Sequence, residues 1–195
     1  VVFDINLSPK PDPPHPSMPV FWGGYRLEFK IIEISIYDQF KDDIESLRRN
    51  ATVVGPAFKR KFSIDISKME YCQGKKAIDI EGYTVFVYSP EMIIFEKLRA
   101  VCQQMPQYRE TIGKSHDSAR ARDFFDIHAI CDRFSLDLIS SQNLELLEKI
   151  FSQKKVSLRL LNQIADFREM HRKDFAVVQD TVKRGCKIQE FDFYF

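Results

Sequence analysis

Alternating apolar and polar positions predict strands in the first ninety residues of the chain. Side chains of successive strand residues point to opposite faces, so a half-buried strand alternates with a period of two. The segments assigned to strands are residues 1–8, 25–31, 59–67, 77–80 and 83–88. The last two flank Glu81-Gly82, a pair that favours a hairpin turn. Proline recurs throughout residues 9–19 and excludes a helix or an inner strand there.

Helical periodicity dominates the rest of the chain. One amphipathic helix is predicted over residues 37–50, where Phe40, Ile44 and Leu47 recur at helical spacing. Ser89-Pro90-Glu91 has the residues of a helix start, with serine as N-cap, proline in the first turn and then an acid. From there the pattern stays helical to about residue 184. Breaks in it are predicted near residue 106, over 113–118 and over 135–143.

The two patterns together predict an α+β fold. A strand-rich part over residues 1–89 precedes a helical part over residues 90–195. Strands and helices are segregated along the chain, which argues against the regular βαβ alternation of a parallel sheet.

Composition and charge narrow the class of protein. The 195 residues are 44% hydrophobic and 29% charged, as in an ordinary globular protein. The formal charge of +1 excludes a uniformly basic nucleic-acid binder, although a local basic groove remains open. No run approaches the ~20 apolar residues of a membrane span. Residues 1–19 lack the pattern of a secretory signal, so we expect the cytoplasm.

The spacing of the cysteines and the absence of common catalytic motifs exclude several kinds of site. Cys72, Cys102, Cys131 and Cys186 lack the close spacing of a zinc site and are expected to be reduced thiols. No phosphate-binding loop, serine-hydrolase elbow or H-E-x-x-H motif occurs.

Acidic residues on predicted strands are the first candidates for chemistry. Asp4 and Asn6 alternate on one strand, so their oxygens could share a divalent cation. Asp65 lies mid-strand between two isoleucines, where an acid is unfavourable. An exposed polar strand face is the commoner explanation of both features, and Asp79 occurs in a similar context.

Two helical segments carry the second group of candidates. Lys97 lies at the edge of the apolar stripe of residues 91–105, and Asp123 lies within the stripe of residues 118–134. A carboxylate on a buried stripe is costly unless it meets a cation, a metal or several donors. We therefore predict that Lys97 and Asp123 approach each other. A buried structural ion pair of Asp123 with Lys97 or Arg120 is the alternative to a functional role.

Basic residues are more often solvated than bound to RNA, but several could line a groove. They are Lys59 to Lys61, Lys75, Lys76, Arg120, Arg122, Arg168, Arg172 and Lys173.

The helical motifs resemble those of the AbiEii/AbiGii family of nucleotidyltransferase-like toxins. That family has S-x-E at the end of a strand, E-K-x-x-A on a helix, and [KR]-x-[KR]-D-x-x-D on a later helix. Here these motifs are Ser89-Pro90-Glu91, residues 96–100 and residues 120–126. FSIDIS resembles the middle motif and contains Asp65. The resemblance covers roughly residues 20–135, and the combined spacing is more specific than any single motif.

The resemblance implies a polymerase-β-like nucleotidyltransferase core followed by a helical bundle. The implied reaction transfers a nucleotide from an NTP to an acceptor such as tRNA, with Mg²⁺ neutralising the phosphates. The implied metal ligands are Asp4, Asn6 and Asp65. The implied catalytic residues are Asp4, Asp65, Lys97 and Asp123, and the implied substrate-binding residues are Lys97, Arg120, Arg122 and Asp126. Asp123 would be an essential acid or would orient Lys97. A cognate antitoxin is a further implied partner.

The start of the sequence departs from the family pattern. The glycine-containing turn expected upstream of Asp4 is absent, and Asn6 replaces the second acid. Either the chain is a fragment or the first motif has decayed. We therefore expect weak NTP binding, slow transfer and a first strand at a sheet edge. The alternative function is a catalytically inactive remnant that binds protein or RNA.

Overall fold

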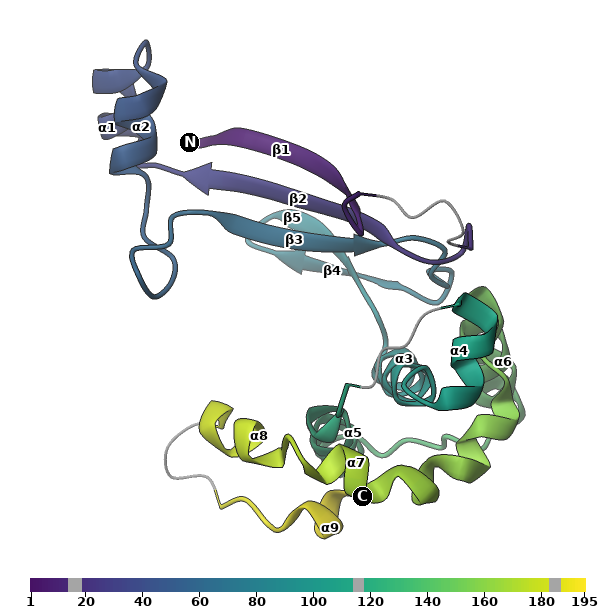
Figure 1. Cartoon of the computed structure of the whole chain (residues 1–195). Coiled ribbons are helices and arrows are strands. Elements are labelled where there is room, and N and C mark those ends of the chain that lie inside the picture. The colour runs from purple at the N-terminus through teal and green to yellow at the C-terminus, as the bar shows by residue number, and fades with distance from the viewer. Residues whose placement is uncertain (14–18, 114–117, 183–186) are drawn as a thin grey trace. The chain divides into compact units, whose positions relative to one another are not determined.

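The structure is a computed structural model that describes residues 1–13, 19–113, 118–182 and 187–195 (Figure 1). The chain divides into two compact units, residues 1–68 and residues 69–195. This division lies about twenty residues before the boundary predicted at residue 89. The reason is the hairpin of β4 (Lys76–Ile80) and β5 (Tyr83–Val87), which forms its own two-stranded sheet within the second unit.

The first unit contains a three-stranded antiparallel sheet. Its strands are β1 (Val2–Lys10), β2 (Gly24–Ile31) and β3 (Phe62–Ser67), in the order β1-β2-β3. The expectation that the first strand lies at a sheet edge is confirmed for the described strands. Because β2 lies between them, β1 and β3 are not direct neighbours.

The single helix predicted over residues 37–50 is two short helices. They are α1 (Ile34–Phe40) and α2 (Ile44–Asn50). Asp43 separates them, because its side chain accepts hydrogen bonds from the backbone amides of Glu45 and Ser46 and so caps α2.

The first unit has few fully buried apolar residues. Phe21, Ile32, Leu47 and Ala51 are buried. The apolar strand residues Leu7, Ile64 and Ile66 remain about half exposed, at 45–58%. With so small a core, the unit depends strongly on regular pairing between its strands.

The predicted hairpin at the start of the second unit is confirmed. Glu81 and Gly82 join β4 to β5 and both have positive φ, 53° and 85°. Two left-handed residues are what a two-residue type I′ turn requires. Asp79 accepts a hydrogen bond from the Gly82 amide, which gives this acid a role in the turn.

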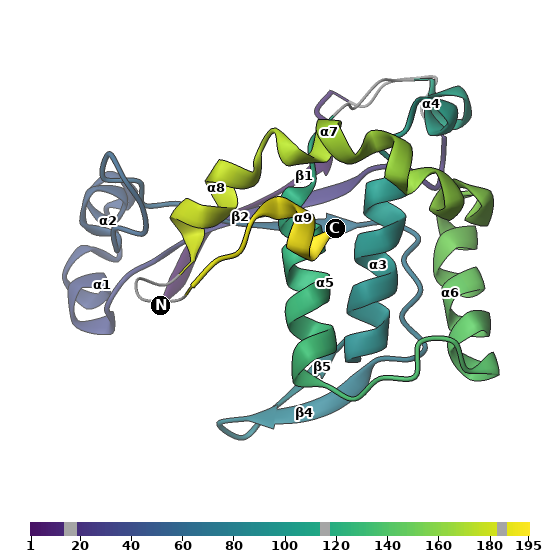
Figure 2. The same ribbon diagram turned by 90° about the horizontal axis from the view of Figure 1, so that it is seen from below.

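Helices make up the rest of the second unit. They are α3 (Pro90–Cys102), α4 (Pro106–Ile112), α5 (Ala121–Arg133), α6 (Ser141–Gln153), a 3₁₀ helix η1 (Leu158–Phe167), α7 (Arg168–Arg172), α8 (Phe175–Thr181) and α9 (Phe191–Tyr194). α3 lies between α5 and α6 (Figure 2). One core cluster joins α3, α5, α8 and α9 through Val101, Ala121, Phe124, Phe175, Val178 and Phe191.

The helical breaks agree only partly with the predicted ones. Helices end before Pro106, at Ile112 and at Arg133, near the predicted breaks, although residues 114–117 lie outside the described residues. The sequence prediction misses a further break, between the end of α6 at Gln153 and the start of η1 at Leu158. Lys155 in this break has a positive φ of 53°, which a helix does not contain. No helix among the described residues is both long and apolar enough to cross a membrane.

The cysteines differ in environment. Cys102 is buried on α3, and burial raises the pKa of its thiol to about 12. The helical periodicity of residues 118–134 places Cys131 and Phe134 on the predicted apolar stripe, but both are exposed, so that prediction is wrong in the last turn. Cys72 is free and exposed, and Cys186 lies outside the described residues.

Candidate functional site

The start of α3 is fixed by the residues that predicted it. Ser89 has extended backbone geometry, and its hydroxyl accepts a hydrogen bond from the Met92 amide at 3.3 Å. Pro90 occupies the first turn, where a missing amide hydrogen is tolerated. On the helix that starts here, Ile94 and Val101 lie in the core and Lys97 faces α5.

Lys97 lies between two carboxylates of α5. Its Nζ donates to Asp123 Oδ1 at 3.0 Å and to Asp126 Oδ2 at 2.6 Å. Asp123 and Asp126 are three residues apart and therefore share one helix face. The prediction that Lys97 and Asp123 approach each other is confirmed. The second carboxylate of the motif joins them.

Two arginines complete this charged cluster. Arg120 Nε lies 2.6 Å from Asp123 Oδ2, and Arg122 Nε lies 3.8 Å from Asp126 Oδ2. Both structural alternatives for Asp123, a pair with Lys97 and a pair with Arg120, therefore hold at once. We call Lys97, Arg120, Arg122, Asp123 and Asp126 the α3–α5 cluster.

Exposure differs sharply within the α3–α5 cluster. The Asp123 side chain is 11% exposed, whereas those of Lys97 and Asp126 are 22% and 29% exposed. Arg122 is largely in solvent, at 68%. The cluster therefore has a buried end that fixes its geometry and an open end that an anion or a hydroxyl group can reach.

Asp4 lies at an irregularity of β1. The register between β1 and β2 shifts between Phe3 and Asn6, and Asp4 has a positive φ of 53°. This bulge interrupts the simple alternation that led us to expect Asp4 and Asn6 on one face. The structure gives no contact between these two side chains, and Asn6 lies opposite Glu28.

Two cations of the chain hold the Asp4 carboxylate. Arg48 donates to both of its oxygens at 2.7 and 3.0 Å, and Lys30 also binds it. These hydrogen bonds, that of Arg48 first, hold the pKa of Asp4 well below its ordinary value.

A separate pair of cations holds the Asp65 carboxylate. Arg26 Nε donates to it at 2.8 Å, and Lys10 forms a second ion pair. The pKa of Asp65 is likewise held low, chiefly by the hydrogen bond from Arg26. Asp65 is half exposed, so these contacts are surface ion pairs of modest strength.

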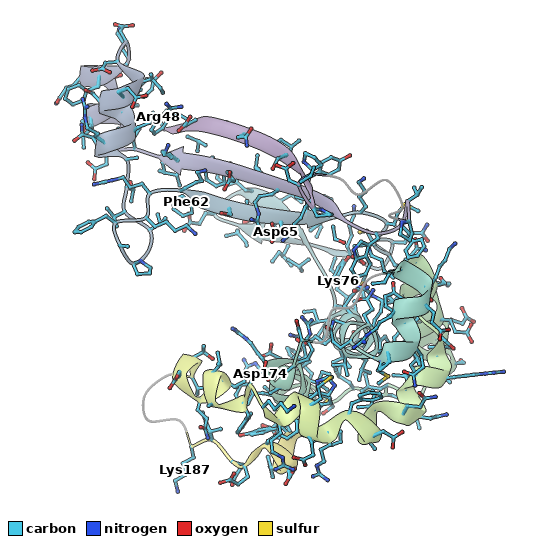
Figure 3. All side chains as sticks on the ribbon, viewed as in Figure 1. Arg48, Phe62, Asp65, Lys76, Asp174 and Lys187 are labelled. Carbon is cyan, nitrogen blue, oxygen red and sulfur yellow. The ribbon has the colours of Figure 1, made fainter. Side chains whose placement is uncertain are left out.

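The structure does not bring Asp4 and Asp65 into one site. Asp65 lies opposite Arg26, which lies opposite Ser8, four residues beyond Asp4 on β1. That offset is about 13 Å along the strand direction, and two strand spacings add about 10 Å across the sheet. Figure 3 shows Asp65 on β3 and Arg48, the partner of Asp4, beyond the far end of the sheet.

A metal site shared by Asp4, Asn6 and Asp65 therefore does not fit this arrangement. Two carboxylates must lie within a few ångströms of each other to bind the same Mg²⁺ ion. Here they lie on β1 and β3, about four residues apart in register, and each is already neutralised by two cations. No group of three or more potential metal ligands occurs among the described residues.

Sequence reasoning missed a buried ionic network on the other side of α3. Arg99 binds Glu96 at 3.0 Å and Glu70 at 3.2 Å, and Glu70 also binds Lys154 at 3.2 Å. Arg99 is only 6% exposed, because this side of α3 is also covered. Burial raises the pKa of Glu96 and lowers that of Lys154.

An open cavity of about 360 Å³ lies between the beginnings of α3 and α6. Lys76, Glu91 and Asn143 are among its lining residues, and Figure 3 labels Lys76. None of the predicted catalytic, substrate-binding or metal-binding residues lines it.

Comparison with known proteins identifies one family. A family model described as "Nucleotidyl transferase AbiEii toxin, Type IV TA system" matches residues 37–195. No curated protein and no solved structure matches the chain. The matched range includes Asp65 and all of the α3–α5 cluster, whereas Asp4 and Asn6 precede it.

Proposed function

Since this chain belongs to the AbiEii nucleotidyl transferase toxin family, we propose that it transfers a nucleotide from an NTP to an RNA acceptor, such as a tRNA end, in the cytoplasm. A type IV toxin–antitoxin family also implies a cognate antitoxin. The observation that carries the proposal is the position of Lys97. Its ammonium group is held by two carboxylates of the family motif and remains 22% exposed.

The α3–α5 cluster supplies groups suited to such a transfer. Lys97 and Arg122 would bind triphosphate oxygens, since charge-assisted hydrogen bonds to phosphate are strong and directional. Asp123, the more buried carboxylate, would keep Lys97 in place. Asp126, the more exposed one, would accept a hydrogen bond from the acceptor hydroxyl.

The reaction is a displacement at the α-phosphorus. A bond forms between the acceptor oxygen and the α-phosphorus, the bond from that phosphorus to the bridging oxygen breaks, and pyrophosphate leaves. The hydroxyl proton would pass to Asp126. Positioning and charge neutralisation account for most of the catalysis in phosphoryl transfer, and these are what a fixed set of cations provides.

Metal dependence is part of the proposal, since the family resemblance implies Mg²⁺. We assign no ligand set to the ion. Asp4 could bind it only by releasing Lys30 and Arg48, and Asp65 only by releasing Lys10 and Arg26.

A catalytically inactive protein that binds an RNA or protein partner is the second candidate function. The specific observation in its favour is the state of Asp4 and Asp65. Each is neutralised by two cations of the chain, and they lie far apart in the sheet.

A labelling assay tests the proposal against this alternative. The chain is incubated with each of the four α-³²P-labelled NTPs, total tRNA and Mg²⁺, with a parallel EDTA arm. We expect label in RNA from one or more NTPs, loss of label in EDTA, and at least about a hundredfold loss in Asp126→Asn, whose amide is a poor proton acceptor. Glu145→Gln, a change at an exposed acid on α6, is the matched control and should label like wild type. RNA that stays unlabelled by the wild-type chain in every arm supports the inactive alternative.

A further inference from the structure

The helix that carries Asp123 and Asp126 begins without a cap of its own. Arg120 occupies the N-cap position of α5, and its side chain, which pairs with the Asp123 carboxylate, accepts no hydrogen bond from the backbone amides of the first turn. The first amides of a helix have no acceptor within the helix, so a buried helix start needs acceptors from elsewhere. Ala121, the first residue of α5, is completely buried.

Two side chains from about fifty residues later supply these acceptors. The Arg120 amide donates to His171 Nδ1 at 3.2 Å. The Ala121 amide donates to Asp174 Oδ1 at 3.1 Å. His171 lies on α7, and Asp174 precedes α8 and is labelled in Figure 3. The negative charge of a carboxylate at the N-terminal end of a helix also interacts favourably with the helix dipole.

His171 is built into the core as a neutral acceptor. Its side chain is fully buried, and its ring packs on Phe124 with the centroids 5.2 Å apart. Burial lowers the pKa of His171 to about 4, against an opposing effect of Asp174 and Asp123. Only the neutral imidazole has a ring nitrogen that can accept the Arg120 amide hydrogen.

The C-terminal residues hold α7 against α5. Arg172, next to His171, donates to Asp192 at 2.6 and 2.9 Å. Phe191 is buried and packs edge-on against Phe124 of α5 at 5.8 Å. Two contacts therefore fix the position of the capping residues. The His171 ring packs in the core, and the neighbouring Arg172 binds Asp192 of the C-terminal residues.

We propose that His171 and Asp174 are positioning residues that cap α5 from outside the helix and thereby place Asp123 and Asp126 against Lys97. The catalytic part of this inference rests on the proposed function, whereas the cap itself does not. Asp123 lies only two residues after Ala121, so a shift of the first turn moves its carboxylate directly. Fixing such groups to within a fraction of an ångström is what supporting residues do in an active site.

Two pairs of variants test the cap. Asp174→Ala removes the acceptor, whereas Asp174→Asn keeps a side-chain oxygen that can cap. His171→Phe keeps a ring of similar shape without the acceptor, whereas His171→Asn keeps an acceptor. Asp180→Ala, an exposed acid on α8, is the matched control.

Hydrogen exchange of the α5 amides reads out the cap without reference to activity. We expect the Ala121 amide to exchange about five- to tenfold faster in Asp174→Ala than in wild type. It should return toward the wild-type rate in Asp174→Asn and stay unchanged in Asp180→Ala. His171→Phe should raise the exchange rate of the Arg120 amide by a similar factor, and His171→Asn should raise it less. Equal exchange in wild type, Asp174→Ala and His171→Phe would overturn the cap.

The pH dependence of stability gives an independent signature of His171. Its pKa in the folded protein, about 4, lies below the ordinary value of 6.5. The stability that neutral His171 provides is therefore present above pH 6.5 and lost progressively as the pH falls toward 4. The charged groups facing it are Arg120, Asp123 and Asp174. The difference in Tm between wild type and His171→Phe should shrink over this window, and a difference independent of pH counts against a neutral acceptor.

Transfer kinetics test the catalytic part. If the cap positions the carboxylates, Asp174→Ala should lower kcat about tenfold with KM within twofold of wild type, and Asp174→Asn should recover most of kcat. Faster amide exchange with unchanged kcat would overturn the positioning role and leave the cap. A wild-type chain without transfer activity would contradict the proposed function and remove the positioning role with it, while the exchange data still decide the cap.

Discussion

Replacing Asp123 by Ala should lower the free energy of unfolding of the helical unit by about 3 kcal/mol. The change leaves Lys97 and Arg120 without the carboxylate that holds both of them at a mostly buried position. Breaking a buried ion pair by removing one partner costs about 3–5 kcal/mol, and the partial exposure of Lys97 places this case at the lower end. Urea unfolding followed by helical circular dichroism measures the change, because long helices occur only in the second unit among the described residues.

Glu145→Ala is the matched control for Asp123→Ala. Glu145 pairs with Lys149 at 3.6 Å on the surface of α6, and both side chains are more than half exposed. Its loss should change the stability by no more than about 0.5 kcal/mol. Similar small effects of both substitutions would show that the α3–α5 cluster contributes little to folding.

Replacing Gly24 by Ala should unfold or severely weaken the first unit. A Cβ atom at Gly24 would lie 1.9 Å from the carbonyl oxygen of Ile66 and 2.9 Å from its carbonyl carbon. These are backbone atoms of β3, so the strands must separate where Gly24 pairs with Ser67. Overpacking of this kind costs about 1–3 kcal/mol even against movable side chains, and a small core can offset little of it.

Trp22 makes this effect measurable separately from the second unit. It is the only tryptophan of the chain and lies two residues before Gly24. Denaturant titration followed by Trp22 fluorescence should show the transition shifted strongly or lost in Gly24→Ala, with the helical circular dichroism transition preserved. Gly55→Ala is the control, because its Cβ would meet only the Lys59 side chain at 3.5 Å. A Gly24→Ala protein with the wild-type Trp22 transition would show that β2 and β3 do not pair in this register.

Features fixed by local chemistry could be predicted from the sequence. The hairpin turn needs only Glu81-Gly82 between two apolar segments, and the start of α3 needs only Ser89 and Pro90. The meeting of Lys97 and Asp123 could be predicted because a carboxylate on an apolar helix stripe requires a partner. The local signal of Asp43 as an N-cap was also present, and the break between α1 and α2 was missed because the apolar spacing continues across it.

Features set by distant segments could not be predicted in the same way. Asp4 and Asp65 are separated by the sheet order and by a bulge, neither of which the strand patterns indicate. The burial of Arg99 depends on Glu70 and Lys154, which come from elements far apart in the sequence. The cap of α5 joins residues about fifty positions apart, and nothing around His171 indicates that its ring nitrogen meets an amide of Arg120.

Transfer activity of Lys97→Met tests the central claim, that the α3–α5 cluster is the catalytic centre of a nucleotidyltransferase, most directly. Methionine keeps much of the length of the lysine side chain and removes the charge. Lys149→Met, at an exposed lysine on α6, controls for the loss of one positive charge. With labelled NTP and total tRNA, and with both proteins shown to be folded at the assay temperature, we predict that Lys97→Met labels RNA at least about a hundredfold more slowly than wild type. Lys149→Met should label it at the wild-type rate. Labelling by Lys97→Met at the wild-type rate would contradict the claim.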